Sequence, residues 1–259
     1  MNIITCGDCI EVLKEFPNNC IDLTITSPPY DNLRIYSGEY MYDLKAVANH
    51  LFRITKIGGV VVLVIGDATI KGSETGTSFR HALYYMEIGF NLHDTMIYAK
   101  NNPIPQNHNR YEQQFEYMFV FSKGKPKTFN PRKIPTKGAG KEYSWKDTND
   151  YGPKSAKRSR DEVSVVKEYK NDFNIWYYNT AVGKYTNSAP FPVKLVRDHI
   201  LTWSNEGDLV LDPMSGSGTT CLVAKLLNRN YIGIDISDEY CKMAEERMRV
   251  EKNPDLLED

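Results

Sequence analysis

Hydrophobic positions along the chain form short apolar runs that alternate with segments of helical periodicity. Seven runs predict strands: Asn2–Cys6, Ile21–Thr26, Gly59–Ile65, Thr95–Ala99, Glu116–Ser122, Leu209–Asp212 and Tyr231–Asp235. Six segments predict helices: Cys9–Phe16, Tyr42–Lys56, Ser78–Ile88, Pro192–Trp203, Thr219–Leu227 and Ser237–Val250. Several of the strands are rich in Val and Ile, as buried parallel strands are. The alternation predicts an α/β fold with a mostly parallel sheet.

Two departures from this alternation carry information. The strands Thr95–Ala99 and Glu116–Ser122 flank a polar segment without helical periodicity, which predicts an antiparallel hairpin at the sheet edge. From 124 to 185 the chain is rich in Lys, Pro, Gly and Ser, and only Val163–Val166 and Phe173–Tyr178 have the pattern of ordered segments. That stretch is too long for a structureless connection within a compact domain. It predicts an inserted recognition segment.

Charge is distributed unevenly along the 259 residues. Lys123–Lys170 holds 14 Lys and Arg against 6 Asp and Glu, a net of +8, so the remainder carries −9 of the total of −1. A basic block in an acidic protein is typical of a partner that is a polyanion, and it is equally typical of a solvated surface loop. No apolar run approaches the ~18 residues of a membrane helix, and no secretory pattern opens the chain. These features predict a cytoplasmic protein.

The five cysteines do not form a metal-binding or disulfide pattern. Cys6 and Cys9 are spaced as half of a zinc site, but no second CxxC or HxxxH pair follows. Reduced thiols without a metal are therefore expected.

A glycine-containing loop, Asp212-Pro-Met-Ser-Gly-Ser-Gly-Thr-Thr220, joins an apolar strand to a helix. Its glycines allow the backbone to approach a ligand, and the helix start offers free N–H groups. No Gly-Lys-Ser/Thr follows, so the loop is not a P-loop, and a purely structural turn is an equal alternative. Asp235 ends the next strand, where a carboxylate can hold ribose hydroxyls, and Asp8 follows the first strand, where it can accept from an adenine amino group. Each Asp alone is also a common helix cap.

A second motif, Thr26-Ser-Pro-Pro-Tyr30, follows the strand Ile21–Thr26. Two prolines end the strand and form a rigid turn at its carboxyl end, where ligands bind in open α/β sheets. The Ser27 hydroxyl and the Pro28 carbonyl can both accept hydrogen bonds from an amino group. Tyr30 offers a flat face for stacking on a base.

Together these two motifs resemble motifs IV and I of the DNA amino-methyltransferases, and their order resembles the permuted β group. Other stretches resemble motifs III, VIII, X and II: Gly7–Leu13, Asn102–Gly124, Asn187–Leu195 and Tyr231–Ser237. Motif X often begins His-Pro, whereas this chain has Asn187 and Ser188. The resemblance stops at the basic insertion, where this group carries its variable target-recognition region.

The resemblance implies a Rossmann-like methyltransferase fold with an antiparallel edge hairpin and an inserted target-recognition region. Residues 1–123 are then the catalytic half, 124–185 the insertion and 186–259 the cofactor-binding half. The implied catalytic residues are Ser27, Pro28, Pro29 and Tyr30. The implied S-adenosylmethionine-binding residues are Asp8, Phe191, Asp212, Pro213, Ser215, Gly216, Gly218, Thr219 and Asp235. The expected DNA-binding residues of the basic insertion are Lys133, Lys137, Lys154, Lys157, Arg158 and Arg160.

The expected reaction is methyl transfer from S-adenosylmethionine to an exocyclic amino group of a base flipped out of double-stranded DNA. Cytosine carbon-5 methylation is excluded because the chain has no Pro-Cys dipeptide. In the resembled family, Ser at position 27 is more typical of N4-cytosine enzymes and Asp of N6-adenine enzymes, so N4-cytosine is favoured and N6-adenine is the alternative. RNA is disfavoured because RNA-modifying relatives usually carry Asn there.

Two alternatives come from different classes of protein. One is a catalytically silent nucleic-acid-binding module, which would have lost Ser27, Tyr30 or the glycine loop, and none of these is lost. The other is a Rossmann-type oxidoreductase, but the loop lacks the third glycine of GxGxxG. A cognate restriction endonuclease and a homodimer are further partners that the resemblance leaves open.

Overall fold

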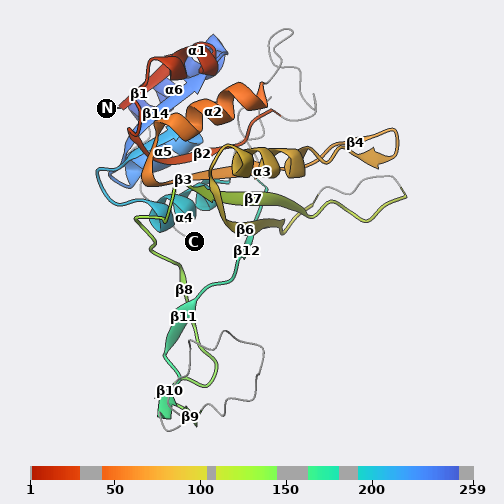
Figure 1. Cartoon of the computed structure of the whole chain (residues 1–259), viewed down its shortest axis with the longest axis vertical. Coiled ribbons are helices and arrows are strands. Elements are labelled where there is room, and N and C mark those ends of the chain that lie inside the picture. The colour runs from red at the N-terminus through yellow and green to blue at the C-terminus, as the bar shows by residue number, and fades with distance from the viewer. Residues whose placement is uncertain (1, 30–42, 104–108, 145–162, 181–191, 251–259) are drawn as a thin grey trace. The chain divides into compact units, whose positions relative to one another are not determined.

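The computed structural model describes residues 2–29, 43–103, 109–144, 163–180 and 192–250 (Figure 1). The chain divides into two compact units. The larger unit comprises Met1–Asn130 and Asn174–Asp259, and the smaller unit is Pro131–Phe173.

An eight-stranded sheet organises the larger unit. Its strands, in spatial order, are β1 (Asn2–Cys6), β14 (Asn230–Asp235), β13 (Leu209–Asp212), β2 (Ile21–Thr26), β3 (Thr55–Ile65), β7 (Phe115–Ser122), β6 (Asn91–Lys100) and β12 (Ile175–Tyr178). The first five are parallel to one another, β7 is antiparallel to both β3 and β6, and β12 is parallel to β6. The expected α/β fold, with a mostly parallel sheet and an antiparallel hairpin, is confirmed.

Helices cover both faces of this sheet. They are α1 (Cys9–Lys14), α2 (Leu44–Ile54), α3 (Thr77–Glu87), α4 (Val193–Trp203), α5 (Thr219–Leu226) and α6 (Asp238–Val250). Strand β3 shows why two layers are needed, because its side chains alternate between two cores. Val60, Val62 and Val64 pack with residues of α4 and α5. The intervening Val61, Leu63 and Ile65 pack with residues of α1, α2 and α3.

Two details differ from the sequence analysis. The β6–β7 hairpin is not the edge of the sheet, because β12 pairs outside it in register from Ile175↔Ile97 to Tyr178↔Lys100 and buries Trp176 and Tyr178. This strand lies in the range 124–185 assigned to the insertion, yet it belongs to the main sheet. Helix α2 also ends earlier than expected, since Thr55 pairs with Ile21 and begins β3.

Short hairpins make up the remaining strands. In the smaller unit β8 (Lys133–Pro135) pairs with β11 (Tyr169–Asn171), and β9 (Glu142–Ser144) pairs with β10 (Val163–Val165). In the larger unit β4 (Thr69–Ile70) pairs with β5 (Ser73–Glu74).

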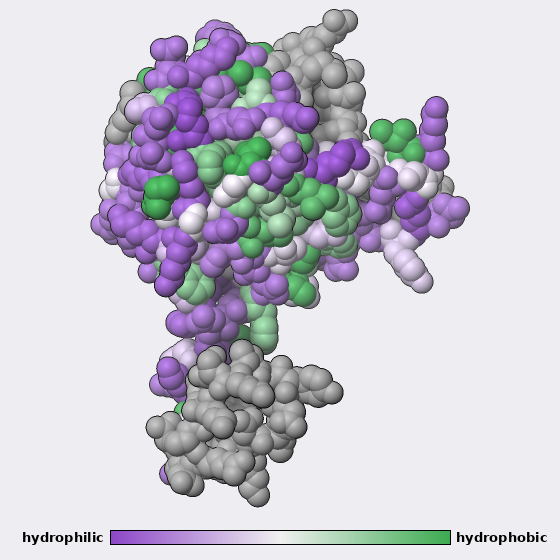
Figure 2. All heavy atoms as spheres, viewed as in Figure 1, coloured by the Kyte–Doolittle hydropathy of each residue, from purple (hydrophilic) through white to green (hydrophobic). Residues whose placement is uncertain are grey.

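Most apolar side chains of the larger unit are buried, but α3 is an exception. Phe79, Leu83 and Met86 are 53%, 66% and 47% exposed. Phe79 also packs edge-on against Tyr117 of β7, with 5.6 Å between the ring centroids. Figure 2 shows hydrophobic surface gathered around α3 and β7. Across the described part of the chain, no helix has the length and hydropathy needed to span a membrane.

Candidate active site

The carboxyl ends of the parallel strands bring the predicted residues to one edge of the sheet. Cys6 pairs with Asp235, so Asp8 lies just beyond the end of β14. Asp212 pairs with Gly233, and β13 lies beside β2, which ends immediately before Ser27. The carboxylates and the Ser-Pro-Pro turn therefore follow four adjacent strands, at the edge where open α/β sheets bind ligands.

The two glycines of the loop after β13 have different roles. Both have positive φ, 51° at Gly216 and 77° at Gly218, a conformation that favours glycine. A Cβ at Gly216 would meet open space, so this backbone is accessible to a ligand. A Cβ at Gly218 would lie 2.7 Å from Cβ of Ala244, so Gly218 allows α6 to pack against the loop.

A third glycine, Gly233 in β14, was not singled out from the sequence. An added Cβ there would lie 2.7 Å from Sγ of Cys221 and 3.0 Å from Oγ of Ser215. Because Gly233 has no side chain, the glycine loop and α5 can pack directly against β14. The only sign of it in the sequence is a glycine interrupting an apolar strand, which is typical of a close approach.

Asp235 fixes the loop to the end of β14. Its Oδ2 accepts from the backbone N–H of Gly216 at 2.8 Å, and its Oδ1 accepts from the N–H of Ser237 at 2.9 Å. Burial raises the pKa of Asp235, and these backbone hydrogen bonds oppose the rise. Each carboxylate oxygen retains a second lone pair that can accept from a ligand hydroxyl.

Asp8 has the helix-capping geometry that the sequence analysis left open. Its Oδ1 accepts from the backbone N–H of Ile10 at 2.7 Å at the start of α1. The side chain is half-buried. A cap uses only part of the hydrogen-bonding capacity of a carboxylate, so capping and ligand binding are compatible.

Asp212 is the most buried carboxylate at this edge, with 2% of its surface exposed. It accepts from Oγ1 of Thr220 at 2.7 Å and from the backbone N–H of Met214 at 3.2 Å. Burial raises its pKa to about 6, against the lowering effect of these hydrogen bonds. Nearby, the buried hydroxyl of Ser215 has no hydrogen-bond partner among the described residues. A buried carboxylate and an unsatisfied hydroxyl beside an open backbone fit a polar, cationic ligand.

Ser27 and Pro28 form the other half of the site. Ser27 is half-buried, Pro28 is buried and Pro29 is half-buried. No described residue forms a hydrogen bond with the Ser27 hydroxyl or the Pro28 carbonyl oxygen. Both acceptors are therefore available to a substrate. Tyr30 and Phe191 lie outside the described residues.

Two other residues that the sequence predicted to bind the cofactor, Pro213 and Thr219, contribute to the structure of the glycine loop. Pro213 is buried beside Asp212. Thr219 begins α5, and its hydroxyl accepts from Nη1 of Arg247 at 3.2 Å. Arg247 also donates to the Ser217 carbonyl at 2.7 Å, so it ties α6 to the glycine loop.

Sequence reasoning missed Asp67, which follows β3 by two residues at the same edge. It accepts from the Ser78 backbone N–H at 3.0 Å and from the Thr75 hydroxyl at 3.3 Å, and the Ser78 hydroxyl donates to it. Its position two residues after a strand, like that of Asp8 after β1, was the available sign. Asp67 fixes the start of α3 at the sheet edge that also carries the Ser-Pro-Pro turn.

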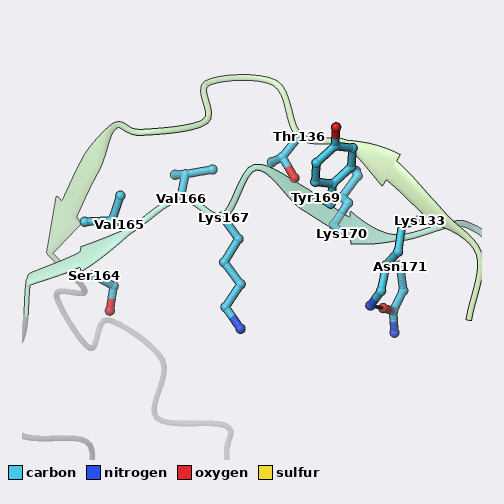
Figure 3. A pocket seen from close by; sticks show the side chains of 9 residues that line it. All are labelled: Lys133, Thr136, Ser164, Val165, Val166, Lys167, Tyr169, Lys170 and Asn171. Carbon is cyan, nitrogen blue, oxygen red and sulfur yellow. Dashed lines mark hydrogen bonds between the residues drawn. The ribbon is translucent and has the colours of Figure 1, made fainter. Parts of the chain in front are cut away.

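The smaller unit contains a separate groove of about 650 Å³. Three lysines, one tyrosine and one asparagine contribute to its lining (Figure 3): Lys133, Lys167, Lys170, Tyr169 and Asn171. Of the predicted DNA-binding residues, Lys133 lines the groove and Lys137 does not. Lys154, Lys157, Arg158 and Arg160 lie outside the described residues. Among all the described residues, no three His, Cys, Asp or Glu side chains lie close enough together to hold a metal ion.

A mostly parallel sheet with a glycine loop after one central strand and a carboxylate after the next defines a Rossmann-like fold that binds a nucleotide-containing cofactor. The family model described as DNA methylase, which covers N6 and N4 enzymes, matches residues 21–246. The chain belongs to this family.

Individual relatives agree with the family. The orphan methyltransferase M.BamHII of Bacillus amyloliquefaciens is 50% identical over 248 residues, covering 92% of each chain. The type II methyltransferase M.SmaI of Serratia marcescens is 28% identical and covers 95% of this chain and 90% of its own.

Solved structures agree as well. M1.HpyAVI in complex with S-adenosylmethionine has a TM-score of 0.64 at 25% identity and covers 96% of this chain and 100% of its own. The cytosine-N4-specific PvuII methyltransferase shares the fold, with a TM-score of 0.69 at 22% identity over 97% of this chain and 87% of its own. The chain is thus a DNA methyltransferase, and S-adenosylmethionine is its cofactor.

Proposed function

We propose that this protein transfers the methyl group of S-adenosylmethionine to N4 of a cytosine flipped out of double-stranded DNA. The observation that carries the proposal is the pair of available acceptors, the Ser27 hydroxyl and the Pro28 carbonyl, at the same sheet edge as the glycine loop. Serine rather than aspartate at position 27 favours N4 of cytosine. N6 of adenine, which presents the same amino group, is the alternative substrate.

Orientation is the main task of the substrate side of this site. An exocyclic amino nitrogen is a weak nucleophile because its lone pair is delocalised into the ring. When Ser27 and Pro28 each accept a hydrogen bond from one of its two hydrogens, the nitrogen is drawn toward tetrahedral geometry and its lone pair is less delocalised into the ring. S-adenosylmethionine would supply an electrophilic methyl group on a sulfonium. The N–C bond would form as the S–C bond breaks with its electrons left on sulfur, and the methylated nitrogen would release one proton to solvent. Positioned hydrogen bonds therefore supply most of the catalysis, and a strong base is not required.

On the cofactor side of the site, polar residues at successive positions along the sheet edge bind different parts of S-adenosylmethionine. Asp212, Ser215 and Gly216 hold the methionine portion, in line with the buried charge and the open backbone there. Asp235 binds the ribose hydroxyls, and Asp8 accepts from the adenine amino group. Pro213, Gly218 and Thr219 shape the loop, and Phe191 packs against the cofactor.

Basic residues of the insertion bind the DNA backbone in this proposal. Lys133 and Lys137 are exposed, and Lys154, Lys157, Arg158 and Arg160 extend the same charged stretch of sequence. Phosphate contacts of this kind make affinity fall steeply with salt. The cytoplasm, where bacterial DNA lies, is the expected location.

A homodimer through α3 is supported by the exposed side chains of Phe79, Leu83 and Met86, which form one stripe at helical spacing. A second copy is the favoured occupant because the apolar stripe is flanked by exposed residues of opposite charge, Arg80 and Glu87. Two antiparallel α3 helices would bring each Arg80 near the Glu87 of the other copy. Leu83→Glu should shift the sedimentation of the protein from dimer to monomer, whereas Ile57→Glu should not. A monomeric wild-type protein would contradict this dimer.

Deletion of the gene tests whether a cognate restriction endonuclease accompanies this protein. The relative at 50% identity is named an orphan methyltransferase, whereas M.SmaI is named a type II enzyme. Without a paired nuclease, deletion leaves the host viable. Loss of viability that is rescued only by an active copy would instead reveal a paired nuclease.

Mass spectrometry of nucleosides tests the proposed reaction directly. DNA of mixed sequence and, in a parallel reaction, total cellular RNA are incubated with the protein and methyl-labelled S-adenosylmethionine, then digested to nucleosides. N4-methylcytosine is the expected product. N6-methyladenine would retain the mechanism and overturn the base assignment, and label confined to RNA substrates would overturn the DNA substrate.

A further inference from the structure

A small hairpin projects from the catalytic edge of the larger unit (Figure 1). It comprises β4 and β5 and begins four residues after β3, the strand that lies beside β2 and the Ser-Pro-Pro turn. The base of the hairpin is closed by a hydrogen bond of 3.0 Å from Thr75 N–H to the Ala68 carbonyl. Asp67, which binds both Thr75 and Ser78, then fixes that base to the start of α3.

The tip of this hairpin is tight and fully exposed. Lys71 and Gly72 have φ of 49° and 81°, as in the two-residue turns that match the twist of paired strands. The six residues 69–74 are all exposed, so the hairpin buries no side chain of its own. Ile70, next to the turn, is 52% exposed. A large apolar side chain at the end of such a projection contributes nothing to a core.

A second segment braces the hairpin. Arg110 lies in the connection between β6 and β7, which leaves the sheet at the same edge. Its guanidinium donates to the Gly72 carbonyl, and Nη1 lies 3.8 Å from the Glu74 carboxylate. A two-stranded hairpin is only marginally stable in water by itself. Bracing from both its base and its tip therefore gives a stiff element at the entrance to the site.

We infer that Ile70 is a wedge that enters the DNA base stack where the target base has left it, with Lys71 against a flanking phosphate. The inference rests on the proposed function, because only a base that leaves the duplex creates such a gap. Enzymes that extrude a base lose its stacking and pairing energy, and an apolar side chain placed between base steps offsets part of that cost. A stiff hairpin at the sheet edge that also carries the Ser-Pro-Pro turn suits this task, since a flexible one would lose entropy on insertion.

The test compares paired and unpaired targets. The DNA carries the site at which the wild-type protein methylates its substrate, located by sequencing of methylated bases. One duplex is fully paired, and the other has a mismatch opposite the target base, which lowers the energy of extrusion. Ile70→Ala should slow single-turnover methylation of the paired duplex about tenfold and that of the mismatched duplex less than about twofold.

Ile57→Ala is the matched control. Ile57 is the same residue type, is 72% exposed and lies near the amino end of β3, at the opposite edge of the sheet. It should leave both rates unchanged. An equal loss of methylation rate on both duplexes would show that Ile70 has a structural role. An unchanged rate on the paired duplex would contradict the proposal that Ile70 is a wedge. If sequencing finds no methylated base in DNA treated with the wild-type protein, it is the proposed function that fails.

Discussion

The carboxyl edge of the sheet and the Pro131–Phe173 unit are built in opposite ways. At the edge, Asp212 and Asp235 are held by backbone and hydroxyl donors, and Asp212 is almost fully buried. In the smaller unit, strands of three residues surround an open groove, and Lys133, Lys167 and Lys170 line it. Groups that orient a reaction need fixed surroundings, whereas lysines that contact phosphates act largely through charge and tolerate exposure.

Because the two regions are built differently, mutations in them should have different effects. Changes at the edge should alter one step of the reaction by a large factor and leave DNA affinity alone. Changes in the groove should alter the salt dependence of DNA binding and leave the chemistry alone. Four experiments test this difference, in order of decreasing expected effect.

Ser27→Ala should lower turnover about 10²–10³-fold, the usual cost of removing one hydrogen bond that orients the reacting group. The affinity for S-adenosylmethionine should stay near that of the wild type, because the proposed partner of the hydroxyl is the substrate base. Single-turnover kinetics and calorimetry measure the two quantities separately. A parallel loss of cofactor affinity would show that Ser27 shapes the whole edge. Ser27→Asp should retain measurable turnover, since aspartate also accepts from an amino group.

Asp212→Ala should weaken S-adenosylmethionine binding about 10²-fold in calorimetry, because the variant loses the charged group that we propose as a hydrogen-bonding partner of the cofactor. Glu206→Ala is the control, since Glu206 is an exposed acid that precedes β13 at the opposite edge of the sheet. Unchanged affinity of Asp212→Ala would mean that the glycine loop does not bind the methionine portion.

Lys167→Gln combined with Lys170→Gln should reduce the slope of log affinity against log salt by about 1.8, from roughly 0.9 for each phosphate contact. Lys125→Gln combined with Lys127→Gln is the control, because it removes the same charge from two exposed positions that do not line the groove. Fluorescence anisotropy at several salt concentrations distinguishes the two pairs. Equal slopes for both pairs would mean that charge, and not the groove, determines binding.

Asp212→Asn should stabilise the cofactor-free protein at pH 8 and not at pH 3.5. The pKa of Asp212 is raised from 3.8 to about 6 by burial, so the folded state binds the proton more tightly than the unfolded state. Wild-type stability is therefore lost as the pH rises from about 4 through about 6, by at most roughly 3 kcal/mol. Urea unfolding of both proteins at the two pH values measures this. A gain that persists at pH 3.5 would have a cause other than ionisation.

Much of the larger unit is readable from local sequence patterns. The apolar runs locate seven strands of the sheet, and each predicted helix is present within a few residues of its expected ends. Ser27, Asp212 and Asp235 were identified because each stands at or just after the end of a strand. Parallel strands align their carboxyl ends, so a local pattern was enough to place these residues at one edge.

Other features depend on contacts between distant segments. The sequence presents Gly216 and Gly218 alike, and only the packing of Ala244 distinguishes an open glycine from a packed one. Arg110 gives no local sign of its contact with Gly72, 38 residues earlier.

Local sequence patterns were enough to predict the class of fold, the strand ends at which we place the reaction and the basic insertion, because hydrophobic periodicity and charge are local properties. Contacts between distant segments determine that β12 completes the sheet outside β6, that the compact smaller unit is limited to Pro131–Phe173, and that Lys133 lines a groove while Lys137 does not. A strand can pair with several others, and a groove forms only where distant segments come together. Both depend on long-range packing, which a local sequence pattern does not predict.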